Sequence, residues 1–161
     1  MQRKKRILLV SHCILNQNTV IENEARAEGA VLSATDWATK QGFGILQLPC
    51  PEFTFLGLDR PPMTYEEYNT PEYRGHCREI LKPVLHQAEE YIKHNFEITG
   101  MLGIQSSPSC DPTRGVFIEE LTAMFAEKGI PLSTLWYLPN SSEPVFNGDE
   151  HFVGAGKKSH E

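Results

Sequence analysis

The sequence predicts a single α/β domain with a three-layer, Rossmann-like fold, in which a mostly parallel sheet of four or five strands carries helices on both faces. Three observations lead to this prediction. The apolar segments are short and nearly uninterrupted, which is typical of strands buried on both faces of a parallel sheet. They alternate with longer segments of helical periodicity, as parallel strands with crossover helices do. The length of 161 residues suits one domain.

Four apolar runs predict the strands. In chain order they span residues 6–13, 43–50, 98–105 and 131–138. The first three runs each lead into a cysteine or into a serine-rich loop that contains one. Parallel strands end at a common edge of the sheet, so these loops are expected to meet there.

Three segments between the apolar runs predict helices. Residues 21–41 begin with acidic side chains and end at Gly42, as helices often do. Residues 72–95 place apolar side chains at steps of three and four, with an expected kink at Pro83. Residues 115–128 have acidic side chains early and a lysine late, which suits the helix dipole.

Two segments lie outside this alternation. Residues 51–71 have no clear period, and a connection of that length in a compact domain is usually a lid or a binding loop. Residues 141–161 are rich in glycine, serine and charged side chains and are expected to form a partly flexible tail. The domain itself is therefore expected to span residues 1–140.

The charge balance excludes some partners. With 15 lysines and arginines against 21 aspartates and glutamates, the net charge of −6 disfavours DNA binding through phosphate contacts. No apolar stretch approaches the roughly 20 residues that cross a bilayer, and the apolar run near the N-terminus is too short for a secretory signal. We therefore expect a cytoplasmic protein without a membrane partner, in a compartment that keeps thiols reduced.

Three of the four cysteines follow predicted strands. Cys13, Cys50 and Cys110 come at or just after strand ends, so their thiols are expected to gather at one sheet edge and to suit a metal or iron–sulfur centre. Cys77 lies on the apolar face of a predicted helix and is expected in the core. A zinc site with His12 is an alternative, although neighbours on a strand point to opposite faces.

Polar groups accompany these thiols. Glu52 follows the rigid Pro49-Cys50-Pro51 turn and is a candidate general base. Asp111 is a candidate helix cap, which would place a helix N-terminus beside the Cys110 thiolate.

Three motifs in this sequence resemble the 2-thiouracil desulfidase family. They are SHCILN, PCPEFTFLGLDRPP and SSPSCD, within a framework of about residues 6–115, and the CPE and SPSC parts are the most specific. The resemblance implies a 4Fe-4S cluster held by Cys13, Cys50 and Cys110, with one open iron and no protein ligand on it. It also implies Glu52 and Ser107 as catalytic residues.

The resemblance implies a hydrolytic, non-redox enzyme. Sulfur would leave a thiocarbonyl compound such as a thiolated nucleobase and be released as hydrosulfide. The sequence departs from the family after the first cysteine, where it reads ILNQNTVIENEARAEG, and after SPSC, where Asp111 replaces a glycine. These changes fall where substrate would lie, so a related subgroup with another small thio-substrate is expected.

Other interpretations stay open at this point. The same cluster could serve a sensor or a sulfur carrier, and a zinc-dependent hydrolase would use similar ligands. The 51–71 loop, with Phe53, Phe55, Arg60 and Tyr65, favours an enzyme because these side chains could line a pocket. The base could be Glu52, Asp111 or another carboxylate, and the oligomeric state is undetermined by the sequence.

Overall fold

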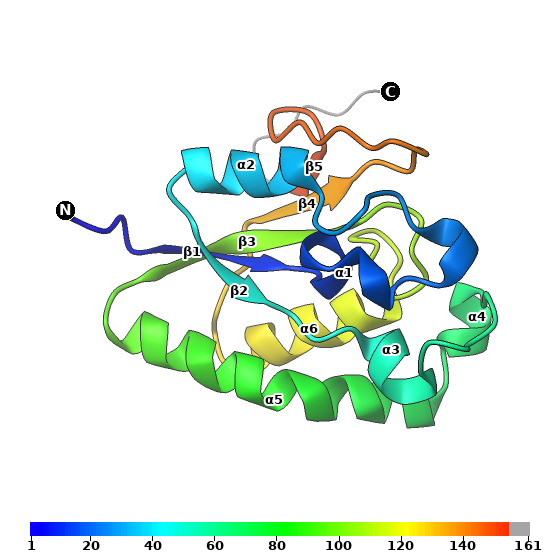
Figure 1. The fold of residues 1–161 in the computed structure, drawn as a ribbon. Helices are drawn as coiled ribbons and strands as arrows, with labels where there is room; N and C mark the ends of the chain where they lie inside the picture. The colour runs from blue at the N-terminus through cyan, green and yellow to red at the C-terminus, as the bar shows by residue number, and fades with distance from the viewer. Residues whose placement is uncertain (155–161) are drawn as a thin grey trace.

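A computed structural model, which describes residues 1–154, confirms the α/β fold with a five-stranded sheet (Figure 1). The strand order is β2-β1-β3-β4-β5; the first four strands are parallel and β5 pairs antiparallel with β4. The strands are β1 (Arg6–Val10), β2 (Gly44–Gln47), β3 (Glu97–Ile104), β4 (Thr134–Leu138) and β5 (Phe152–Gly154).

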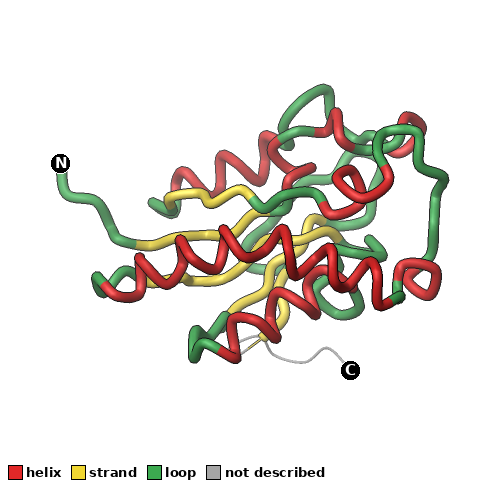
Figure 2. Tube along the Cα trace, turned by 90° about the horizontal axis from the view of Figure 1, so that it is seen from below, coloured by secondary structure: helices red, strands yellow, loops and turns green. Residues whose placement is uncertain are grey.

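Helices cover both faces of the sheet, as predicted. The α-helices are α1 (His12–Leu15), α2 (Leu32–Lys40), α3 (Pro51–Leu56), α4 (Tyr65–Tyr68), α5 (Pro71–Lys93) and α6 (Val116–Glu127). Figure 1 shows α2 on one face and α5 with α6 on the other, and Figure 2, seen from below, shows helices covering the strands and running roughly along them. Within residues 1–154, none of the helices combines the length and apolar character needed to cross a membrane.

The alternation of side chains along β1 builds a core on each face. Ile7 and Leu9 pack into the cluster under α5 and α6, whereas Leu8 and Val10 pack into the cluster under α2. All four side chains are buried, which explains why this strand reads as a continuous apolar run.

The prediction of a helix over residues 21–41 is correct only for its second half. Only Leu32–Lys40 is helical, and the preceding residues form a loop with two short 3-10 turns, η1 (Gln17–Thr19) and η2 (Glu22–Glu24). η2 buries no side chain, so no packing energy supports a longer helix there.

The 51–71 segment contains more regular structure than its sequence predicts. α3 begins with Cys50 as its N-cap and a proline in its first turn. α4 begins with a capping box between Thr64 and Glu67. Helices of four to six residues are too short to show a period, which is why pattern analysis misses them.

The packed structure also continues past residue 140. Phe146 is buried in the cluster under α2, and β5 adds a fifth strand. A strand of three residues gives no alternation to detect. Residues 155–161, which complete the expected flexible tail, lie outside the described residues.

Candidate functional site

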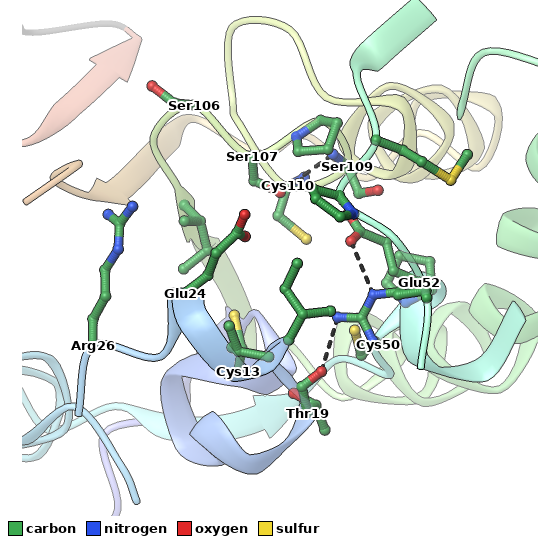
Figure 3. A pocket seen from close by; sticks show the side chains of 18 of the residues that line it. Cys13, Thr19, Glu24, Arg26, Cys50, Glu52, Ser106, Ser107, Ser109 and Cys110 are labelled. Carbon is green, nitrogen blue, oxygen red and sulfur yellow. Dashed lines mark hydrogen bonds and ion pairs between the residues drawn. The ribbon is translucent and has the colours of Figure 1, made fainter. Parts of the chain in front are cut away.

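A cavity of about 380 Å³ opens at the carboxyl ends of the parallel strands, and Cys13, Cys50 and Cys110 all line it (Figure 3). The three residues follow β1, β2 and β3, so the sheet brings them to one edge although they are far apart in the sequence. The expected gathering of these thiols at one edge is therefore what the fold produces.

Cys13 lies on α1, the single helical turn directly after β1. The Gln17 side chain donates to the Cys13 carbonyl oxygen at 2.8 Å and so fixes this turn. The expected placement of His12 and Cys13 on a strand is wrong, because the chain turns into a helix at Ser11. His12 is not among the residues that line the cavity.

Cys50 is the N-cap of α3. Its Sγ accepts the Phe53 backbone N–H at 3.5 Å, which favours negative charge on the sulfur. The Thr54 hydroxyl donates to the Cys50 carbonyl oxygen at 2.8 Å and also contacts His76 Nε2 at 2.7 Å. These bonds attach the Cys50 turn to α5.

Cys110 lies in a loop that folds back on the end of β3. The Ile104 N–H donates to the Cys110 carbonyl oxygen at 2.9 Å. The Ser107 Oγ accepts the N–H groups of Ser109 at 3.3 Å and Cys110 at 3.0 Å. Ser107 thus positions Cys110, and its own O–H has no acceptor among residues 1–154.

Asp111 does not cap a helix, contrary to expectation. Its carboxylate accepts the N–H groups of Ser106 at 2.7 Å and Thr113 at 2.8 Å, so it closes the loop around Cys110. α6 begins later, at Val116, with Gly115 as its N-cap. Asp111 is also absent from the cavity lining, which leaves it without access to a substrate there.

Gly103 allows this loop to approach β3. A Cβ at this position would overlap the carbonyl oxygen of Cys110. We expect Gly103→Ala to lower the free energy of unfolding by about 2 kcal/mol, as overpacking does, and to displace Cys110. Urea unfolding and titration of accessible thiols measure the two effects. Gly75→Ala is the matched control, because that helical position has open space and alanine should stabilise it.

Burial keeps the three thiols neutral in the absence of a cation. It raises the pKa of Cys13 to about 12, with smaller contributions from Cys50 and Glu52. Burial also raises the pKa values of Cys50 and Cys110. The Ser11 hydroxyl, which is buried without a well-formed hydrogen bond among residues 1–154, opposes the shift at Cys110. An unpaired hydroxyl beside a buried sulfur is the kind of donor that a thiolate ligand requires.

Glu52 is ion-paired at the cavity wall. Its carboxylate contacts Arg60 Nε at 3.4 Å, and the two side chains are 18% and 6% exposed. Arg60 also donates to the carbonyl oxygens of Gly57 at 2.9 Å and Thr19 at 2.8 Å. Arg60 therefore joins the loop after α3 to η1, and Glu52 balances its charge.

Comparison with known proteins finds a relative that is similar to this chain along most of its length. The chain is 40% identical over 141 residues to the protein named Uncharacterized protein MJ0003 of Methanocaldococcus jannaschii, covering 86% of this chain and 90% of that protein. The chain belongs to the family of this archaeal protein. No family model and no solved structure matches the sequence. Coverage of most of both chains means that the members of this MJ0003 family share the domain rather than a single motif.

In this member of the MJ0003 family, most of the residues that were expected from the 51–71 loop do not line the cavity. Of the four side chains expected from the 51–71 loop, only Arg60 lines it. Phe53 and Phe55 are about 40% exposed. Phe55 also packs on Tyr73 of α5, and the Tyr65 hydroxyl donates to Glu119 of α6.

Another wall of the cavity was not predicted at all. It is formed by the loop between α1 and α2 and includes Gln17, Thr19, Glu24 and Arg26. The expectation of a helix over residues 21–41 concealed Glu24 and Arg26. The mixture of charged and amide side chains in this segment, without apolar periodicity, was the available signal.

Proposed function

We propose that this protein is an iron–sulfur-dependent desulfidase, which hydrolyses a thiocarbonyl compound such as a thiolated nucleobase and releases hydrosulfide. The observation that supports this most is the meeting of three cysteines from three loops at one cavity. A volume of about 380 Å³ lies in the range of small-ligand pockets. Cys77 lies on α5 with its side chain buried in the core. The cavity is therefore lined by three cysteines, Cys13, Cys50 and Cys110.

The donor set fits a 4Fe-4S cluster. Cys13, Cys50 and Cys110 would hold it, and an iron without a protein ligand would supply Lewis-acid polarisation of the substrate's thiocarbonyl group. Within residues 1–154 no three His, Cys, Asp or Glu side chains are gathered closely enough for a single metal ion. A cluster distributes its ligands over several irons and suits more widely spaced thiols than a zinc ion does.

The protein's own groups orient the reactants. Glu52, held beside Arg60, accepts a hydrogen bond from the attacking water. Ser107, whose oxygen already accepts two backbone N–H groups, donates its O–H to the substrate where negative charge develops. The water oxygen replaces sulfur on carbon, and sulfur leaves as hydrosulfide. The oxidation state of carbon does not change, so no electron donor is required.

The proposal is tested by product analysis with the protein reconstituted without oxygen. Thiolated pyrimidines and other thiocarbonyl compounds are supplied in ¹⁸O-water, and hydrosulfide and the oxo product are quantified. The expected result is equal amounts of both products with ¹⁸O in the carbonyl, without a reductant. A loaded cluster with no hydrosulfide from any substrate would favour a sensor or sulfur carrier. Activity with zinc alone would favour a zinc hydrolase.

Ser107→Ala is expected to lower kcat by roughly 100-fold, because it removes a donor to the developing charge. It also removes the acceptor for the Cys110 N–H, which should cost about 1 kcal/mol of stability. Steady-state hydrosulfide release and urea unfolding separate the two effects. Ser107→Thr keeps the hydroxyl and should retain most of the activity; equal losses in both variants would contradict the role of the O–H.

A further inference from the structure

The cavity contains a second carboxylate, Glu24, which the sequence analysis did not single out. Among the described lining residues, Glu24 and Glu52 are the acidic ones. They lie on different segments, Glu24 at the end of η2 and Glu52 in the first turn of α3. Figure 3 shows the Glu24 side chain directed into the cavity toward the side on which Ser107 and Cys110 lie.

The two carboxylates have different surroundings. Glu52 is mostly buried, and its carboxylate is held by the ion pair with Arg60. Glu24 belongs to an exposed turn, and its carboxylate forms no ion pair or hydrogen bond with the residues from 1 to 154. Among the described residues, the Glu24 carboxylate is therefore the acidic group of the cavity that has no partner and is reached by solvent.

Buried contacts hold the Glu24 segment over the cavity. Gln17 is 5% exposed and donates through Nε2 to the Cys13 carbonyl oxygen at 2.8 Å. The Gln17 Oε1 accepts the Arg26 backbone N–H at 2.8 Å, and the Gln17 backbone N–H donates to the Gly29 carbonyl oxygen at 2.7 Å. The loop that carries Glu24 is thus tied to the same turn that presents the Cys13 thiol.

We propose that Glu24 is the general base of the desulfidase reaction, while Glu52, held by Arg60, orients the water. This assignment rests on the proposed function. In the step, one O–H bond of water breaks and its proton goes to Glu24, while the oxygen bonds to the thiocarbonyl carbon. The remaining hydroxyl proton then moves to sulfur as the C=O bond forms and the C–S bond breaks, so sulfur leaves as hydrosulfide. Glu24 then gives the proton to solvent. Atoms and charge balance without an oxidant or a reductant.

The test compares Glu24→Gln and Glu24→Ala with Glu22→Gln, which alters the same turn outside the cavity lining. Glu24→Gln should lower kcat by about 100-fold, the size expected for loss of a general base. Iron content, substrate Kd and Tm should stay at wild-type values. Added acetate should restore part of the turnover of Glu24→Ala, because the position is open to solvent. Glu22→Gln should behave as wild type.

The possible outcomes are distinguishable. Wild-type turnover in Glu24→Gln would overturn the assignment while leaving the proposed function intact. A loss of activity that follows a loss of iron or a lower Tm, without rescue by acetate, would show a structural role and would also overturn it. Absence of hydrosulfide release from the wild type and from Glu22→Gln alike would overturn the proposed function together with the role of Glu24.

Discussion

Replacing Cys110 by serine is expected to abolish cluster retention and to lower hydrosulfide release by at least about 100-fold, because a ligand loss costs no less than loss of a supporting contact. Cys110 is 9% exposed and lies on the loop that Ser107 and Asp111 fix in place. A serine there would occupy the same position without a sulfur donor. Iron and sulfide analysis after reconstitution without oxygen, together with turnover, measures the effect.

Cys77 provides the matched control for this substitution. It is also a buried cysteine, but it packs in the core under α5 and does not line the cavity. Cys77→Ala should lower stability modestly, by roughly 1 kcal/mol for a lost small side chain, and should retain full iron content. Full iron content in Cys110→Ser, or equal iron loss in Cys77→Ala, would contradict the ligand assignment.

Arg60→Met is expected to give the largest loss of stability, about 3 kcal/mol, or roughly 10 °C in Tm. The substitution leaves Glu52 partly buried without its cation and leaves the carbonyl oxygens of Gly57 and Thr19 without their donor. Urea unfolding of the wild type and the variant measures the difference.

Two comparisons identify the cause of this loss. The double variant Arg60→Met with Glu52→Gln should lose less than the sum of the single losses, because it removes the uncompensated charge. Lys82→Met breaks an exposed pair with Glu79 and should leave the stability unchanged within error. An Arg60→Met protein as stable as the wild type would refute the structural role of this ion pair.

The long-range features of the fold were predictable from the sequence. Parallel strands buried on both faces and the long amphipathic helix α5 give strong patterns, because burial decides which residues are tolerated. The helices and strand that were missed are α1, α3, α4 and β5, which are too short for a pattern. The loop before α2 was misjudged because the hydrogen bonds of a single buried glutamine organise it.

The candidate site was predictable only in part. The common cavity of Cys13, Cys50 and Cys110 follows from topology, since each residue comes after a parallel strand. The pairing of Glu52 with Arg60 depends on how two loops pack, and no local pattern encodes it. The position of Glu24 depends on the course of a loop without regular structure. The periodicity of a sequence therefore does not predict where polar groups lie when tertiary contacts position them.

The most direct test of the proposed function is metal and sulfide counting after reconstitution with iron and sulfide in the absence of oxygen. The account predicts about four irons and four sulfides per chain, with broad visible absorption that disappears in Cys13→Ser, Cys50→Ser and Cys110→Ser. Tight binding of zinc alone, or three reactive thiols with no retained iron, would contradict it.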